Sequence, residues 1–201
     1  MATVEVRTPE RILNSALELF ATKGYDATSV REICEAAAIT KPTLYHFYGS
    51  KERVYRALVE GALEGFHNQV VSLLGSAGSP RERLHRVARD YFGHAREHQQ
   101  LVRFLFSLIH NPPSSAPLTD FPRFYEDIVR LISRVVEEGV GEGCFGPGPT
   151  DLRMLVFMGT LAEAVIGYLI VGKPELTPEL ADRLVDVILQ GWVSKGEEPA
   201  P

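Results

Sequence analysis

The chain has 201 residues, of which 45% are hydrophobic and 23% are charged, so it can form one large domain or two small ones around a packed core. This composition excludes a largely disordered protein. The formal net charge is −5, without the basic surplus common in nucleic-acid binders. Residues 1–60, however, carry eight basic and eight acidic side chains, so the acidic surplus belongs to the rest of the chain.

Two cysteines, Cys34 and Cys144, lie far apart in the sequence. They suggest no disulfide framework, which favours a reducing compartment. The N-terminal residues lack the long apolar core of a signal peptide. We therefore expect a cytoplasmic protein.

Helix start and stop signals punctuate the first forty residues. Thr8 is the expected N-cap of a first helix, with Pro9 at its first position and Gly24 at its end. Ser29 and Glu32 have the spacing of a capping box and predict a second, short helix.

Further caps divide the next forty residues. Thr40 is expected to cap a third short helix, and Lys51 to begin a fourth that ends near residue 74. The segment 75–80, GSAGSP, is a break, and Ser79 with Glu82 repeats the capping box before a fifth helix.

The rest of the chain also predicts helices. They are expected at about 100–110, 120–138, 151–172 and 178–195, with Thr177 capping the last and a glycine-rich loop over 139–149. No strand alternation and no internal repeat are present in the sequence. The expected fold is all-α, with about nine helices.

The stretch 40–53, TKPTLYHFYGSKER, is rich in hydrogen-bond donors. Two short helices joined by residues 37–39 fit a helix-turn-helix, whose second helix enters the DNA major groove while flanking donors bind phosphates. Composition and spacing alone fit equally well a polar surface on an ordinary helical bundle.

Residues 8–66 resemble the DNA-binding domain of the TetR/AcrR family of transcriptional regulators. The matching segments, in order and spacing, are Ile12, Ala16, Leu19-Phe20 and Gly24-Tyr25, then TSVREI over 28–33, KPTLY over 41–45 and GSKE over 49–52. The remainder resembles the family only in size and helical content. The resemblance implies a helix-turn-helix domain over 1–50, with the match extending to about 66, and a ligand-binding and dimerisation domain over 51–201.

The resemblance also implies which residues meet DNA. They are Ser29, Arg31, Thr40, Lys41, Pro42, Thr43, Tyr45, His46 and Lys51. Within this set, Lys41, Pro42 and Thr43 would enter the groove, whereas Tyr45, His46 and Lys51 resemble phosphate contacts and Leu44 belongs to the core.

Two positions depart from the family pattern. Many members have His then Phe where this chain has Phe47 and Tyr48, so one phosphate donor is lost unless the Tyr48 hydroxyl replaces it. The turn has Ala38 where glycine is usual, which predicts either a slightly different turn or some strain at a positive φ.

The segment 152–172 is apolar almost all round. A membrane span is the alternative, but a charged Glu163 at its centre would be costly in lipid. Burial between its own domain and a second copy fits better. The dimer interface is expected to include Gly159, Gly167, Leu184, Ile188 and Trp192.

Aromatic side chains in the middle of the chain suit a pocket for an apolar or aromatic effector, although aromatics at helical spacing are more often core. Candidate pocket residues are Phe92, Phe104, His110, Tyr125, Phe157 and Glu163. Pairing of Glu163 within the protein is equally compatible with the sequence.

Other functions have less support. There is no phosphate-binding glycine loop or nucleophile elbow, so we expect no enzyme, cofactor or metal. His94 and His98 have the spacing of a zinc pair but no clear third ligand. The expected function is a sequence-specific regulator, a repressor that an effector releases from a two-fold DNA operator. The alternative is a helical protein-interaction bundle that does not bind DNA specifically.

Overall fold

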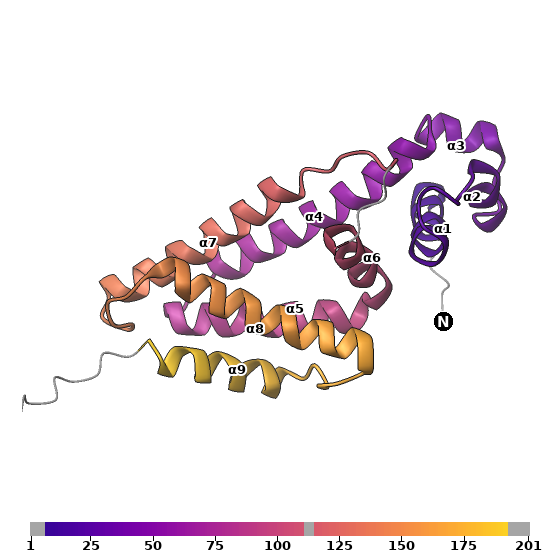
Figure 1. Ribbon diagram of the computed structural model, residues 1–201. Coiled ribbons are helices and arrows are strands. Elements are labelled where there is room, and N and C mark those ends of the chain that lie inside the picture. The colour runs from indigo at the N-terminus through magenta and orange to yellow at the C-terminus, as the bar shows by residue number, and fades with distance from the viewer. Residues whose placement is uncertain (1–6, 111–114, 193–201) are drawn as a thin grey trace, which may run out of the picture. The chain divides into compact units, whose positions relative to one another are not determined.

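The computed structural model describes residues 7–110 and 115–192, and all regular structure within these ranges is helical (Figure 1). The helices are α1 Thr8–Lys23, α2 Val30–Ala36, α3 Lys41–Phe47, α4 Lys51–Gly75, α5 Pro80–Glu97, α6 Gln99–His110, α7 Phe121–Gly141, α8 Thr150–Val171 and α9 Pro178–Gln190. The nine helices of the described ranges confirm the all-α prediction.

Both predicted capping boxes are formed. The Ser29 hydroxyl accepts the Glu32 backbone N–H at 3.2 Å, and the Glu32 carboxylate accepts the Ser29 backbone N–H at 2.8 Å. Ser79 and Glu82 make the same reciprocal pair at 3.3 and 2.8 Å. Each box satisfies N–H groups that a helix start leaves without intrahelical partners.

The single-residue caps are mostly confirmed. Thr40 and Thr177 accept backbone N–H groups of the helices that they precede. The cap expected at Thr8 is wrong, because Arg7 has the extended backbone of an N-cap and Thr8 is already helical. The last helix ends at Gln190, and residues 193–195 of its predicted end lie outside the described residues.

The chain divides into two compact units. Met1–Gly65 and His98–Phe121 form unit 1, whereas Phe66–Glu97 and Pro122–Pro201 form unit 2. Helix α4 therefore contributes residues to both units. The predicted functional boundary at residue 50 stays a prediction, because compactness does not define which segment binds DNA or ligand.

An aromatic cluster forms part of the core of unit 1. Phe20 of α1 lies 5.7 Å from Tyr55 of α4 and 6.3 Å from Phe104 of α6, between ring centroids. Tyr25 lies 4.9 Å from Tyr55. Burial raises the pKa of Tyr55 to about 12. This cluster fastens α6 onto α1 and α4, although α6 is distant in sequence.

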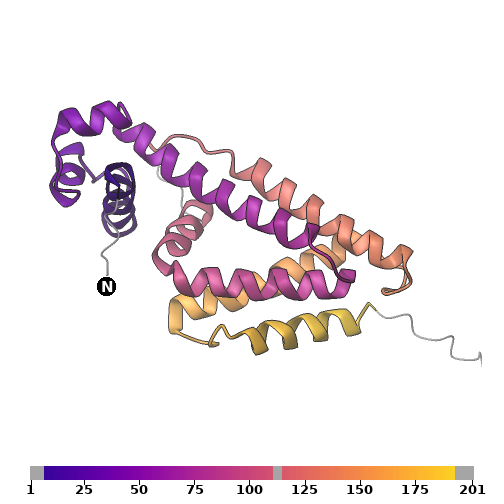
Figure 2. The same ribbon diagram turned by 180° about the vertical axis from the view of Figure 1, so that it is seen from behind.

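Unit 2 is built from α5, α7, α8 and α9 together with the end of α4. Both views show α5, α8 and α9 running side by side (Figures 1 and 2). Its buried side chains include Leu84, Val87, Ala88, Phe92, Ile128, Ile132, Val136, Met154, Phe157, Leu161, Val165, Leu169, Ala181, Val185 and Leu189. On each of these helices the buried side chains recur three or four residues apart, as expected for a helix face that packs against the core.

Charged side chains join α5 to α9 beside that core. Arg81 pairs with Asp186 at 2.6 Å, Arg89 with Asp182 at 2.6 Å, and the Nδ1 atom of His85 lies 2.9 Å from Asp182. The Arg89 hydrogen bond, and then that of His85, lowers the pKa of Asp182. The linked pairs fix the register of α9 along α5.

Of the two alternatives for Ala38, the structure has the positive φ, at 51°, in the turn between α2 and α3. An L-residue in this left-handed region costs about 1–2 kcal/mol, and glycine avoids that cost but loses about 0.5–1 kcal/mol more backbone entropy on folding. We expect Ala38→Gly to raise the free energy of unfolding by about 0.5 kcal/mol.

The matched control for this change is Ala36→Gly, since Ala36 is exposed and lies within α2. Because Ala36 is the last residue of α2, glycine there should lower the free energy of unfolding by at most about 1 kcal/mol. Urea denaturation followed by circular dichroism measures both. Equal losses of stability in the two variants would show that the turn carries no strain.

Candidate nucleic-acid interface

The nine predicted DNA-contact residues all lie in unit 1, at the starts of α2 and α4 and along α3. Seven of them are exposed, and Thr43 and Lys51 are half-buried. The buried residue of α3 is Leu44, with no exposed surface, as the sequence predicts. The exposed side of α3 is therefore opposite Leu44.

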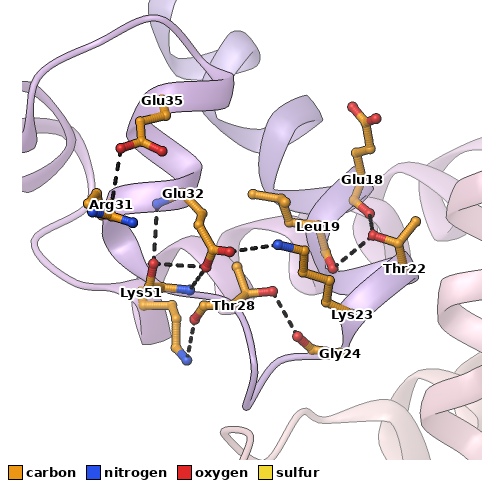
Figure 3. Close-up of polar contacts among 11 residues, drawn as sticks. Glu18, Leu19, Thr22, Lys23, Gly24, Thr28, Arg31, Glu32, Glu35 and Lys51 are labelled. Atoms are coloured by element: carbon orange, nitrogen blue, oxygen red, sulfur yellow. Dashed lines mark hydrogen bonds and ion pairs between the residues drawn. The ribbon is translucent and has the colours of Figure 1, made fainter.

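The start of α2 is held by Glu32 (Figure 3). Its carboxylate accepts from Lys23 at 2.6 Å and from the Ser29 backbone and hydroxyl, each at 2.8 Å. These bonds, that from Lys23 first, lower the pKa of Glu32 to about 2. Ser29 and Arg31 are thus carried on a fixed helix start, and Arg31 makes a 3.5 Å ion pair with Glu35 that remains exposed.

The turn between α2 and α3 is fixed from the side of α1. The Arg11 guanidinium donates to the carbonyls of Ala37 at 2.6 Å and Ala38 at 3.1 Å. The Ile39 N–H closes the turn on the Cys34 carbonyl at 2.9 Å. Because these bonds satisfy the end of α2, the direction in which α3 leaves the turn is set by α1.

Lys51 faces the inside of unit 1 in this structure. Its ammonium donates to the carbonyls of Tyr25 at 2.8 Å and Thr28 at 2.9 Å, and it lies 4.1 Å from the centroid of the Tyr25 ring. Figure 3 shows the bond to Thr28. Two of its three donor hydrogens are used there, so Lys51 holds the α1–α2 turn against the start of α4.

Tyr48 is also engaged within the unit. Its hydroxyl donates to the Pro9 carbonyl at 3.2 Å, and burial raises its pKa. The possible replacement phosphate donor is therefore already bonded. Phe47, next to it, is exposed at the end of α3.

The five predicted pocket residues whose side chains are described have different environments. Phe104 belongs to the aromatic core of unit 1. In unit 2, Phe92 and Phe157 are fully buried, while Tyr125 and Glu163 are exposed. The side chain of His110, predicted with them, lies outside the described residues.

Unit 2 has a different aromatic group, which we call the Phe66 cluster: Phe66 of α4, Tyr91 and His94 of α5 and Phe124 of α7. The Phe66 ring lies 5.8 Å from Tyr91, 6.1 Å from His94 and 6.1 Å from Phe124. All four side chains are half-buried. Burial alone raises the pKa of Tyr91 to about 12, so its hydroxyl stays protonated and can donate a hydrogen bond.

The predicted dimer residues divide into exposed and buried sets. Gly159 is exposed and Leu184 is half-buried, whereas Ile188 and Trp192 are buried within their own unit. A side chain at Gly167 would come within 2.7 Å of the Lys173 carbonyl oxygen. Gly167, Ile188 and Trp192 therefore pack inside unit 2.

Helix α8 exposes an apolar stripe, of which the predicted dimer set included only Gly159. The stripe consists of the exposed Leu152, Leu155, Val156, Gly159 and Ile170 and the half-buried Ile166, and it is interrupted by the exposed Glu163. Leu155 is 67% and Ile170 74% exposed. By length and composition α8 is the one helix of the described residues that could cross a membrane, and 33% of its most apolar window is buried.

Within the described part of the chain, no group of three or more His, Cys, Asp or Glu side chains is placed to hold a metal ion. Cys34 and Cys144 are free thiols. His94 lies in the Phe66 cluster.

Comparison with protein families matches both parts of the chain. Residues 12–58 match the tetR family of bacterial regulatory proteins, and residues 77–192 match the tetracyclin repressor-like C-terminal domain. The chain belongs to the TetR family. It is a DNA-binding transcriptional regulator, and the interaction bundle without DNA binding is not favoured.

Similar proteins extend over nearly the whole chain. The transcriptional repressor KstR2 of Mycolicibacterium smegmatis is 28% identical over 201 residues, covering 95% of this chain and 94% of the relative. The ketosteroid transcriptional regulator KstR2 of Mycobacterium tuberculosis has a TM-score of 0.76 at 25% identity, with 96% and 98% covered. FadR of Bacillus subtilis, in complex with stearoyl-CoA, has a TM-score of 0.72 at 18% identity, with 90% and 97% covered, and so shares the fold.

Replacing Lys51 tests whether it stabilises the α1–α2 turn of unit 1. Lys51→Ala removes two hydrogen bonds from a cation and a contact with the Tyr25 ring. It should lower the free energy of unfolding by about 2 kcal/mol. Thermal denaturation followed by circular dichroism gives the change.

Lys41→Ala is the matched control, because Lys41 is exposed at the start of α3. It should change stability by less than about 0.5 kcal/mol while weakening DNA binding. An unchanged unfolding midpoint in Lys51→Ala would mean that Lys51 does not hold the turn.

Proposed function

We propose that this protein is a cytoplasmic homodimeric repressor that binds a two-fold DNA operator and leaves it when an apolar, carbonyl-bearing effector binds unit 2. The observation that carries the proposal is the exposed, donor-rich α3 on a turn that Arg11 fixes. A helix held in this way can be presented to the major groove without reorganisation.

The exposed side of α3 supplies groups for the base edges of the major groove and for the DNA backbone. Lys41 and Pro42 lie in its first turn and Tyr45 and His46 follow, all exposed. The Thr40 and Thr43 hydroxyls are 2.9 Å apart and hydrogen-bond each other. We assign Lys41 and Thr43 to base edges and Tyr45, His46, Ser29 and Arg31 to phosphates. Lys51 supports them from within the unit and has one donor hydrogen left for a phosphate.

The dimer is proposed to form through the apolar stripe of α8. A stripe of this length on a soluble regulator needs a covering surface. On α9, Leu184 is half-buried and Val187 is 67% exposed, so both helices offer apolar surface to a second copy. Two α8 and two α9 helices would form a four-helix interface with two-fold symmetry.

The effector is proposed to lie against the Phe66 cluster. Half-buried aromatic rings with one protonated hydroxyl suit an apolar molecule that carries a hydrogen-bond acceptor. A carbonyl provides such an acceptor for Tyr91. The names of similar proteins support this class, since one is described as a ketosteroid regulator and another holds stearoyl-CoA.

Selection from a random-sequence DNA duplex library tests the operator. The protein should enrich an inverted repeat whose half-site centres are about 34 Å apart, or a multiple of that. Affinity for this DNA should fall steeply with salt, and Lys41→Ala should reduce the slope of log affinity against log salt by about one. A library that yields no common sequence would contradict the proposed function.

Tyr91→Phe tests the effector site, because it removes the hydroxyl and keeps the ring. A 3-ketosteroid and stearoyl-CoA serve as probes in calorimetry and in DNA release. For whichever probe binds, the variant should lose about three- to tenfold in affinity. Tyr125→Phe is the control, since Tyr125 is exposed on α7, and it should bind as the unmodified protein does. Equal affinities in all three proteins would remove Tyr91 from the site.

A further inference from the structure

The end of α3 carries an apolar side chain at the DNA-facing surface. Phe47 is the last residue of the helix and is 44% exposed, and its ring centroid lies 5.2 Å from that of His46 in an edge-on contact. Tyr45, two residues before it, is 51% exposed. A single exposed phenylalanine on a protein surface needs no explanation. This ring, however, belongs to the helix that we assign to the major groove.

The position of Phe47 on α3 places it beside a groove-facing residue. Phe47 follows Thr43 by four residues, so the two side chains lie on neighbouring parts of one helix face. Phe47 also follows the fully buried Leu44 by three residues, so its ring lies between the groove-facing side of α3 and the side that packs on unit 1. Seven helical residues span about 10 Å, and the major groove is about 12 Å wide. Both ends of α3 therefore lie within reach of base edges.

Two of the hydrogen-bonding side chains that follow Phe47 are engaged within the fold. The Tyr48 hydroxyl is bonded to the Pro9 carbonyl, and two hydrogens of Lys51 are bonded to Tyr25 and Thr28. What the end of α3 offers to DNA is thus an apolar ring with a histidine against it. The apolar group that DNA displays in the major groove is the 5-methyl group of thymine.

We propose that Phe47 contacts a thymine methyl group in each half-site and so specifies thymine there. This inference rests on the proposed operator binding and adds a readout that needs no hydrogen bond. Removing water from one methyl group against a ring changes affinity by about fourfold. The effect should belong to one thymine position in each half-site, because each dimer subunit brings one Phe47.

The experiment uses the duplex recovered by selection, with each thymine replaced in turn by deoxyuridine, which lacks only the methyl group. The unmodified protein should bind about fourfold more weakly when the contacted thymine of one half-site is replaced. Phe47→Ala should bind the thymine and deoxyuridine duplexes equally, which completes a double-mutant cycle. Phe47→Leu keeps an apolar side chain and should keep part of the preference for the methyl group.

Circular dichroism checks that the variants fold, which the exposure of Phe47 favours. If deoxyuridine has no effect at any position, or costs the unmodified protein and Phe47→Ala the same, the inference is overturned while the operator stands. A uniform loss in Phe47→Ala with no coupling to the methyl group would assign the ring to the sugar backbone and would also overturn it. Failure to enrich any DNA would overturn the proposed function and this inference with it.

Discussion

Two cations bonded to backbone carbonyls hold the DNA-reading part of the molecule in place. Lys51 binds the carbonyls of Tyr25 and Thr28, and Arg11 binds those of Ala37 and Ala38. Carbonyls at turns and helix ends need partners once they leave water. These bonds satisfy them and at the same time join α1, α2 and the start of α4, so the orientation of α3 depends on them.

These bonds reduce the number of hydrogen-bond donors that unit 1 can offer to DNA phosphates. A cation whose hydrogens serve the fold contributes less to a phosphate contact, and Lys51, half-buried between two carbonyls, is such a cation. Tyr48 is in the same position. Contacts with phosphates then fall to the exposed side chains of α2 and α3, and these contacts supply the salt-dependent part of the affinity. Sequence discrimination is left to the side chains that we propose to reach base edges and thymine methyl groups.

Local features of this fold could be predicted from sequence, whereas tertiary engagement could not. Ser29, Thr40 and Thr177 act on groups two or three residues away, so their caps were predictable. The N-cap predicted at Thr8 was wrong, because the extended backbone of an N-cap is found at Arg7. The inward bonds of Lys51 join residues 23 to 26 positions apart, and no local pattern encodes them.

The same distinction explains the C-terminal region. Uniform apolarity in α8 predicts burial, but cannot show that one face meets its own unit while the stripe from Leu152 to Ile170 stays exposed. Aromatic spacing likewise did not separate Phe157, which is core, from Tyr91, which is half-buried with a raised pKa. Separating them requires the packing partners, and those come from other helices.

Release of DNA by an effector requires only a difference in its affinity for the free and DNA-bound forms. A hundredfold difference corresponds to about 2.7 kcal/mol, and the less the DNA-bound form is favoured, the smaller the difference that empties the operator. Helix α4 carries Lys51 in unit 1 and Phe66 in unit 2. An effector that moves Phe66 therefore acts on the same helix whose first residue fixes the α1–α2 turn. Coupling by this route would act on the bonds of Lys51 before it reached any group that touches DNA.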